Sequence, residues 1–282
     1  MIIVTGAAGF IGSNLLAELE AAGHRDLVAV DWVGDEDKAR NLAKRKVRAV
    51  LSPEELPDWL SRAGEAVTAI FHMGAISSTD AQDVNLLVEN NITATVRLWD
   101  WCTAAGVRFI YASSAATYGV GDGPFRDDED VPALSALQPA NLYGWSKNET
   151  DLVFANRLAR GEASPPQWAG LKFFNVYGPN EYHKGNMRSV ACQAFDQWQQ
   201  NGEVRLFRSH RPDVPDGDQR RDFIHVRDCT RTMLWLLDHP AVSGLFNCGT
   251  GTARSFTDVV AAVGAAVGTE IRIRFKIGRA HV

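Results

Sequence analysis

The chain begins with an apolar run that leads into a glycine-rich turn. Residues 2–5 read Ile-Ile-Val-Thr, glycines follow at Gly6, Gly9 and Gly12, and residues 11–22 have the apolar spacing of a helix. Glycines between a strand and a helix let a pyrophosphate approach the backbone N–H groups at the positive helix end. The spacing is G-x-x-G-x-x-G rather than G-x-G-x-x-G, but its place directly after a strand favours a dinucleotide site.

Short apolar runs alternate with amphipathic segments through the first two-thirds of the chain. Such runs are typical of parallel strands that are buried on both faces. The alternation predicts an α/β fold with a doubly wound parallel sheet of the Rossmann type. The expected strands are 2–5, 27–31, 68–72, 107–113 and 171–175, the main expected helices are 11–22 and 83–105, and a strand near 245–247 is expected to return to the sheet.

The alternation stops after about residue 175. Residues 177–185 are rich in Pro, Gly and Asn, and residues 209–221 form a polar stretch with two prolines. A long polar loop inside a compact chain usually serves a function. We therefore expect a Rossmann domain over 1–175, with 226–249 returning to it, and a smaller C-terminal substrate-binding lobe over 176–225 and 250–275.

Composition argues against several other classes of protein. With 282 residues, 45% of them hydrophobic, the chain can bury a sizeable core, and its net charge of −5 gives no sign of a nucleic-acid partner. No apolar run approaches the roughly 20 residues of a membrane span, and the chain starts directly with a strand, which leaves no room for a secretion signal. The four cysteines lack C-x-x-C spacing, as is typical of reduced thiols, and this disfavours a structural zinc site. We expect a cytoplasmic protein with no metal site and no membrane partner.

The residues after the second expected strand bear on the choice of dinucleotide. Asp31 ends that strand, where an acid normally accepts a hydrogen bond from the adenosine ribose and favours NAD. Lys38 follows and suits the 2′-phosphate of NADP, or is simply a solvated lysine. The residues leave the choice between NAD and NADP open.

The end of the strand 68–72 lies at the edge where such sheets bind ligands. Gly74 and Ala75 follow it, and these small residues let a cofactor pass close to the backbone. We interpret His72 as a packed core histidine rather than a catalyst. Asn90, in the expected helix 83–105, is either a structural bridge or a cofactor contact.

Tyr143 and Lys147 form a Tyr-x-x-x-Lys pair on one face of an expected helix. The pair alone is common by chance, but here it follows the glycine-rich turn and the strand 107–113. Because an ordinary tyrosine has a pKa of about 10, we expect the Lys147 ammonium to lower the pKa of Tyr143 and make proton transfer practicable. Ser114 is placed to polarise a substrate oxygen. The combination indicates redox chemistry on an alcohol carbon.

Several motifs resemble those of the extended short-chain dehydrogenase/reductase family, which includes nucleotide-sugar epimerases and dehydratases. The motifs are T-G-A-A-G-F-I-G, S-S-A-A-T-Y-G, Y-G-W-S-K and F-F-N-V-Y-G-P, and the resemblance runs from Met1 to about Phe275. Within that family, the chain is similar to the ADP-L-glycero-D-manno-heptose 6-epimerases at H-M-G-A-I-S-S-T, E-N-N, F-N-V-Y-G-P-N-E-Y-H-K-G-N-M, L-F-R-S-H and R-R-D-F-I-H-V-R-D.

The resemblance implies an isomerase that inverts carbon six of ADP-D-glycero-D-manno-heptose, for lipopolysaccharide inner-core biosynthesis. Bound NADP, with NAD as the alternative, would take hydride from carbon six, and the transient ketone would turn and receive hydride on its opposite face. An acid/base group is needed on each side. Tyr143 and Lys184 match the two family groups, with Ser114 supporting the carbonyl oxygen and Lys147 orienting the cofactor. The resemblance also implies a homo-oligomer.

The same matching assigns binding positions. Arg221 also makes independent sense, because a guanidinium fork suits the diphosphate of an ADP-sugar, although Arg220 and Arg221 are alternatively a solvated basic pair. The cofactor positions are Gly6, Gly9, Phe10, Ile11, Gly12, Asp31, Trp32, Lys38, Met73, Gly74, Ala75, Ile76, Ser77, Asn90, Lys147, Val176 and Lys184, and the substrate positions are Ser114, Asn175, Asn186, Gln193, Phe207, Arg208, Ser209, His210 and Arg221.

The chain departs from the family pattern at three places. Met73 stands where relatives often have Glu, and Pro53 stands where they have a second cofactor-side Lys. Relatives run a few dozen residues further, so we expect a C-terminally truncated lobe that lacks a substrate-contacting aromatic residue. Residues 276–282 match one reading frame of a common sequencing adapter, and we hypothesise adapter read-through. A native stop codon after Val282 at the genomic locus would contradict this.

Three other functions compete with this interpretation. A UDP-hexose 4-epimerase lacks the H-K-G base, so Lys184 argues against it. A 4,6-dehydratase requires an Asp-Glu pair beside Ser114, where this chain has Ala115 and Ala116. An inactive dinucleotide-binding protein typically lacks the Tyr143–Lys147 pair, although truncation leaves this alternative open.

Overall fold

The N-terminal glycine-rich turn joins β1 (Ile2–Thr5) to α1 (Phe10–Ala21), as the sequence predicts. The structure is a computed structural model and describes residues 1–34, 36–63, 66–120 and 123–278. All four residues of β1 are buried, because helices cover both faces of the sheet to which it belongs. The predicted bounds of this strand are confirmed.

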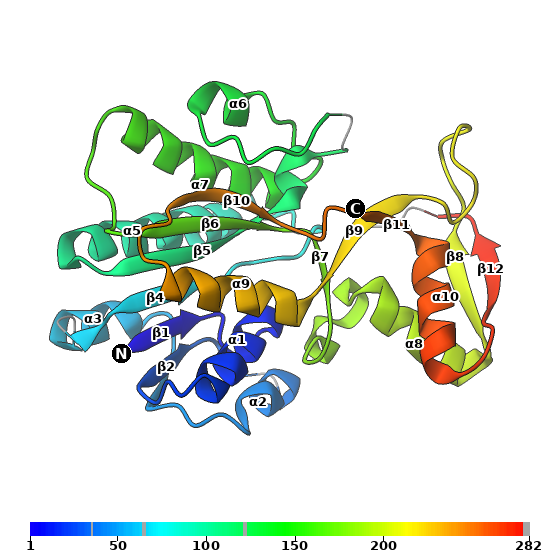
Figure 1. Cartoon of the computed structure of the whole chain (residues 1–282), viewed down its shortest axis with the longest axis horizontal. Helices are drawn as coiled ribbons and strands as arrows, with labels where there is room; N and C mark the ends of the chain where they lie inside the picture. The colour runs from blue at the N-terminus through cyan, green and yellow to red at the C-terminus, as the bar shows by residue number, and fades with distance from the viewer. Residues whose placement is uncertain (35, 64–65, 121–122, 279–282) are drawn as a thin grey trace.

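Within the described residues, the central sheet has seven parallel strands in the order β10-β6-β5-β4-β1-β2-β3 (Figure 1). The chain therefore reverses its direction of winding between β1 and β4, where doubly wound sheets bind their ligands. The predicted fold class is confirmed, and so is the returning strand. The other strands are β2 (Leu27–Val30), β3 (Ala49–Leu51), β4 (Ala69–His72), β5 (Arg108–Ser114), β6 (Trp168–Phe173) and β10 (Gly244–Cys248).

The two faces of the sheet carry separate hydrophobic cores. Val4 points into one core with Leu16 of α1 and Met233 of α9 (Val226–Asp238). Ile3 points into the other core with Trp99 of α5 (Ala94–Ala105). Successive strand residues face opposite sides, so one apolar run supplies both cores. The remaining helices of this part are α2 (Glu36–Leu42), α3 (Leu56–Ala63), α4 (Val84–Leu87), η2 (Val88–Thr93), η3 (Ala115–Tyr118), α6 (Val131–Ser135) and α7 (Leu142–Ala159).

The structure differs from the predicted elements at three places. The expected helix 83–105 is divided by η2, a π-helical turn that contains the buried Asn91. The expected strand 171–175 is two strands, because the chain leaves the central sheet after Phe173 and enters a second sheet at Asn175. β3 was not predicted, because it lies at the sheet edge and none of its residues is buried.

The later segments form a smaller group of elements beside the sheet, on the right in Figure 1. Two further sheets, β11-β9-β7 and β12-β8, occur there, and Val204, Val260 and Ile271 belong to a separate core. The elements are β7 (Asn175–Tyr177), η4 (Tyr182–Met187), α8 (Val190–Asn201), β8 (Glu203–Phe207), β9 (Arg220–His225), β11 (Ala253–Ser255), α10 (Phe256–Val267) and β12 (Arg272–Lys276).

The segment 276–282, for which we hypothesise adapter read-through, is only partly described. Lys276, the last residue of β12, pairs with Phe207 of β8, and Ile277 is 86% exposed. Residues 279–282 lie outside the described residues. In the part of the chain that the structure describes, none of the helices is both long and apolar enough to cross a bilayer.

Candidate active site

A cavity of about 1870 Å³ opens where the sheet reverses and extends to the smaller group of elements. Its volume exceeds the roughly 300–1,000 Å³ of a site for one drug-sized ligand, so it has room for two nucleotides. Every predicted cofactor position lines it, and so do most of the predicted substrate positions. The substrate positions in the lining are Ser114, Asn175, Asn186, Gln193, Phe207 and Arg221.

Three predicted substrate residues lie outside the lining of this cavity: Arg208, Ser209 and His210. Arg208 and the Ser209 backbone both contact Asp216, at 3.8 and 2.7 Å. The His210 Nε2 atom lies 2.7 Å from the Gly278 carbonyl oxygen. These contacts hold the three residues in the exposed loop that follows β8.

The glycine-rich turn packs too tightly for side chains. Gly6 has a φ of +61°, and a Cβ atom on it would lie 2.6 Å from the backbone nitrogen of Gly74. A Cβ atom on Gly12 would lie 2.2 Å from the Gly6 carbonyl oxygen. The turn thus requires glycine at both positions. Because Gly9 caps α1 without a side-chain hydrogen bond, the turn and the first helical N–H groups fit the pyrophosphate of a dinucleotide.

Asp31 and Lys38 form an ion pair in the cavity lining, at the positions that the sequence predicts to contact adenosine. Lys38 Nζ lies 2.6 Å from Asp31 Oδ1, while Asp31 Oδ2 accepts a hydrogen bond from the Ala8 N–H at 2.9 Å. Asp31 thereby supports the glycine-rich turn. The carboxylate that would favour NAD and the ammonium that would favour NADP therefore lie side by side.

His72 is a packed core residue, as interpreted from the sequence. Its Nδ1 and Nε2 atoms lie 2.6 Å from Thr5 Oγ1 and 3.0 Å from Thr95 Oγ1. Burial, and secondarily the charge of Lys147, lower the pKa of His72 to about 3. The imidazole is therefore neutral at physiological pH.

Asn91, rather than its neighbour Asn90, makes the structural bridge. Its amide donates to the Ile76 carbonyl at 3.0 Å and to Ser146 Oγ at 2.9 Å, and its oxygen accepts from the Ile76 N–H at 2.8 Å. Asn91 thus ties the segment after β4 to α7. Asn90 lines the cavity, and its amide donates to the Leu86 carbonyl at 2.9 Å.

Tyr143 reaches Ser114 because α7 approaches η3 closely. A Cβ atom on Gly144 would lie 2.5 Å from the Ala116 carbonyl oxygen, so the glycine beside Tyr143 permits this approach. Burial raises the pKa of Tyr143, and a hydrogen bond from Ser114 opposes that rise. Tyr143 is therefore a phenol at neutral pH.

Lys147 does not have the effect on Tyr143 that we expected from the sequence. Its Nζ donates to the Ala112 carbonyl at 2.8 Å, and burial lowers its own pKa to about 8 against the opposing charge of Asp151. The expectation that Lys147 lowers the pKa of Tyr143 is wrong in this structure, because burial of the phenol dominates. Lys147 lines the cavity.

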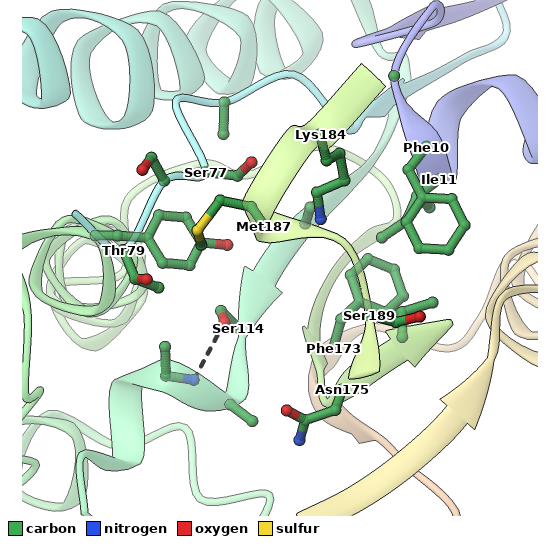
Figure 2. Close-up of a pocket in the computed structure, with 18 of the residues that line it drawn as sticks. Phe10, Ile11, Ser77, Thr79, Ser114, Phe173, Asn175, Lys184, Met187 and Ser189 are labelled. Carbon is green, nitrogen blue, oxygen red and sulfur yellow. Dashed lines mark hydrogen bonds between the residues drawn. The ribbon is translucent and has the colours of Figure 1, made fainter. Parts of the chain in front are cut away.

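Lys184 enters the cavity from η4, far along the chain from Tyr143. Figure 2 shows its ammonium directed into the pocket, above Ser114 in the view. Burial lowers the pKa of Lys184, while the nearby Glu181 carboxylate opposes the change. Its Nζ lies 5.6 Å from the centroid of the Phe10 ring. One cavity therefore contains a phenol that retains its proton and an amine that loses its proton more easily than usual.

The segment that carries Lys184 is held at both ends by a buried carboxylate. Glu181 is 2% exposed and accepts hydrogen bonds from the Gly178 N–H at 3.2 Å, from Ser189 Oγ at 2.7 Å and from the Ser189 N–H. Asn180 Nδ2 donates to Ser13 Oγ of α1 at 3.1 Å. The segment is thus fixed against the helix that begins at the glycine-rich turn.

A buried ion pair lies beside Ser113 and was not identified from the sequence. Lys172 Nζ lies 2.8 Å from Asp151 Oδ2, and Ser113 Oγ and the Tyr111 hydroxyl donate to the same carboxylate at 2.7 and 2.9 Å. Lys172 is 1% exposed. Its place inside the apolar run of β6 was the signal, because a lysine in a strand buried on both faces needs a partner.

Among the predicted substrate residues in the smaller group of elements beside the sheet, Gln193 supports a segment of the chain and Arg221 contributes a positive charge to the cavity. The Gln193 amide donates to the Arg188 and Asn186 carbonyls, at 2.7 and 3.2 Å, and supports the Lys184 segment. Burial lowers the pKa of Arg221, which lines the cavity. Arg205, Arg220 and Lys276 also line it, so this end of the cavity carries several positive charges.

The fold and this site define a nucleotide-dependent enzyme of the epimerase/dehydratase type. Residues 2–249 match the model of the NAD dependent epimerase/dehydratase family, and the chain belongs to that family. It is 46% identical to an ADP-L-glycero-D-manno-heptose-6-epimerase of Nitratidesulfovibrio vulgaris, over 98% of this chain and 84% of the relative.

Solved structures agree with this placement. The crystal structure of Helicobacter pylori ADP-L-glycero-D-manno-heptose-6-epimerase is similar, with a TM-score of 0.78, 26% identity and coverage of 98% of this chain and 84% of that one. MoeE5 in complex with UDP-glucose and NAD has a TM-score of 0.76 and 29% identity, and the match covers 100% of this chain and 86% of that one.

Proposed function

We propose that this protein is an isomerase that inverts carbon six of ADP-D-glycero-D-manno-heptose, giving ADP-L-glycero-D-manno-heptose. The observation that carries the proposal is the meeting of Tyr143 and Lys184 in one cavity with opposite pKa shifts. Inversion at an alcohol carbon needs an acid/base group for each face of the ketone. The assignment of the substrate is supported by the relative that is 46% identical, which is named ADP-L-glycero-D-manno-heptose-6-epimerase.

The glycine-rich turn, the segment after β4 and Lys147 fit a nicotinamide dinucleotide. When bound, this cofactor supplies a hydride acceptor and donor at the alcohol carbon. We propose NADP rather than NAD, because Lys38 at the adenosine end suits a 2′-phosphate and Asp31 is already engaged by Lys38 and by Ala8. NAD remains the alternative.

Side chains of the protein transfer the hydroxyl proton and stabilise the substrate oxygen. Lys184 accepts the hydroxyl proton on one side of carbon six, because its lowered pKa makes the neutral amine accessible. Tyr143 holds a proton for the ketone oxygen on the other side, and Ser114, which hydrogen-bonds to Tyr143, supports that oxygen. Lys184 then releases its proton to solvent and Tyr143 takes one up, which restores the starting protonation states. In the reverse direction the two groups exchange roles.

We further propose that residues 176–225 and 250–275 form the substrate-binding lobe and that residues 1–175 with 226–249 bind the dinucleotide. Arg205, Arg220 and Arg221, which all line the cavity, support a diphosphate site in the lobe, because guanidinium groups pair well with phosphate oxygens. Asn175, Asn186 and Phe207 line the same cavity as these arginines and Ser114.

Interconversion of the two carbon-six epimers tests the proposal. Purified protein with catalytic NADP⁺ should convert ADP-D-glycero-D-manno-heptose into a stable mixture of both epimers, resolved by chromatography. No net NADPH should accumulate, since the reaction is redox-neutral. Absence of the second epimer with either NADP⁺ or NAD⁺ would contradict the proposal.

A further inference from the structure

Thr79 lines the cavity, and its buried hydroxyl has no hydrogen-bond partner among the described residues. Among the described residues, five buried side-chain polar atoms lack a hydrogen-bond partner, and two of them, Thr79 Oγ1 and Gln219 Oε1, belong to residues that line the cavity. A buried polar atom without a partner destabilises a fold and is uncommon in native proteins. At a binding site, such an atom is explained when a ligand supplies the partner.

The neighbours of Thr79 show that the local turn does not need its hydroxyl. Ser78 builds the turn: its Oγ accepts from the Asp80 N–H at 3.3 Å, and its carbonyl accepts from the Ala81 N–H at 3.3 Å. Ser77 is exposed. Only Thr79 of these three residues has a buried hydroxyl that is not satisfied within the described chain.

The segment before Thr79 is fixed relative to the reacting groups. Asn91 binds both backbone polar groups of Ile76 and also Ser146, which precedes Lys147 on α7. Thr79 therefore lies three residues after a point that is tied to the helix carrying Tyr143. The backbone just before Thr79 is therefore tied in place, which reduces the motion that has to be frozen when a ligand binds there.

The position of Thr79 separates it from the dinucleotide turn. In Figure 2, Thr79 and Met187 lie on one side of the view, and Phe10 and Ile11 of the glycine-rich turn lie on the other. Met187 belongs to the segment that carries Lys184. Figure 2 thus draws Thr79 on the side of the pocket away from Phe10 and Ile11, with Lys184 between them in the view.

We propose that Thr79 binds a hydroxyl group of the sugar and is a specificity-determining residue of this site. The inference rests on the proposed function and adds a substrate contact to it. A threonine hydroxyl has one donor and two acceptor positions, and a sugar hydroxyl offers the same set, so the two groups can satisfy each other. A site built in this way discriminates against sugars that lack the matching hydroxyl.

Direct binding measurements test this role. Thr79→Val keeps the shape and removes the hydroxyl, Thr79→Ser keeps the hydroxyl, and Thr269→Val is a matched control on the exposed loop after α10. By calorimetry, Thr79→Val should weaken ADP-D-glycero-D-manno-heptose binding by about threefold to tenfold, the effect of one hydrogen bond. Thr79→Ser and Thr269→Val should bind like the wild type, and NADP⁺ affinity should be unchanged in all three.

The melting temperature separates binding from a structural role. Thr79→Val should melt at the same temperature as the wild type or higher, because it removes an unsatisfied buried hydroxyl. Unchanged sugar-nucleotide affinity, an equal loss of NADP⁺ affinity or a lowered melting temperature would each overturn the inference. A wild type that binds the sugar nucleotide but does not epimerise it contradicts only the proposed function, and a wild type that does not bind it contradicts both.

Discussion

At the scale of single residues, burial gives the two candidate acid/base groups complementary properties. It disfavours the charged form of each, so Tyr143 retains its proton and Lys184 releases its proton more readily. The sequence contained both residues, but it could not give these directions, because both depend on burial by distant segments. Tyr143 was predictable from its spacing to Lys147, whereas only the family resemblance indicated Lys184.

Replacing Tyr143 with Phe should reduce kcat for epimer interconversion by about a hundredfold or more, the usual contribution of a general acid/base. Dinucleotide affinity should change little, because the ring remains in place. Tyr182→Phe is the matched control, since Tyr182 is 60% exposed and does not line the cavity. Steady-state kinetics in both directions measure the effect, and wild-type kcat in Tyr143→Phe would contradict the assigned role.

Lys184→Met should lower kcat by a similar factor, because methionine keeps the length of the side chain but cannot accept or donate the proton. Lys46→Met, at an exposed lysine outside the cavity lining, should retain wild-type kcat. If Lys184→Met kept its activity, a single acid/base group would serve both faces and the two-sided mechanism would be wrong.

At the scale of elements, the strands around the sheet reversal were predictable and the Lys184 segment was not. Strand β1 and the glycine-rich turn have local signals in the apolar run and in the glycine spacing. The segment around Lys184 is irregular, and its place depends on long-range contacts of Asn180 with Ser13 and of Glu181 with Ser189. Such contacts leave no periodic pattern. Arg208–His210, which match substrate positions but lie outside the cavity lining, are likewise held by contacts with Asp216 and Gly278 that the sequence pattern does not show.

Glu181 should act through Lys184, because it binds both ends of the segment that carries the amine. We expect Glu181→Ala to lower kcat about tenfold, through the loss of hydrogen bonds to a buried carboxylate. In a double-mutant cycle, adding Glu181→Ala to Lys184→Met should cause little further loss. Glu162→Ala, at an exposed site just after α7, is the control. Additive losses in the cycle would show that Glu181 acts independently of the amine.

At the scale of the whole molecule, the sheet and the site share buried groups, so stability and pH are linked. The pKa of His72 is about 3 in the folded chain against 6.5 for the ordinary side chain. The unfolded chain therefore binds a proton between these values that the folded chain does not bind. Stability from this group is present above pH 6.5 and is lost as the pH falls toward 3.

The free energy of unfolding should accordingly fall by about 2 kcal/mol between pH 7 and pH 5 through His72 alone. Urea unfolding of the wild type and of His72→Asn at both pH values measures this contribution. The variant should be less stable at pH 7 but should show a smaller loss on acidification. An identical pH dependence in both proteins would mean that His72 is not the group responsible.

The central claim is that hydride leaves carbon six and returns to the same carbon. The most direct measurement uses ADP-D-glycero-D-manno-heptose with deuterium at carbon six and follows the label in both epimers by mass spectrometry and NMR. The account predicts that the product retains deuterium at carbon six in ordinary water. Loss of the label to solvent during epimerisation would show that a proton, rather than hydride, is removed from carbon six, and would contradict the account.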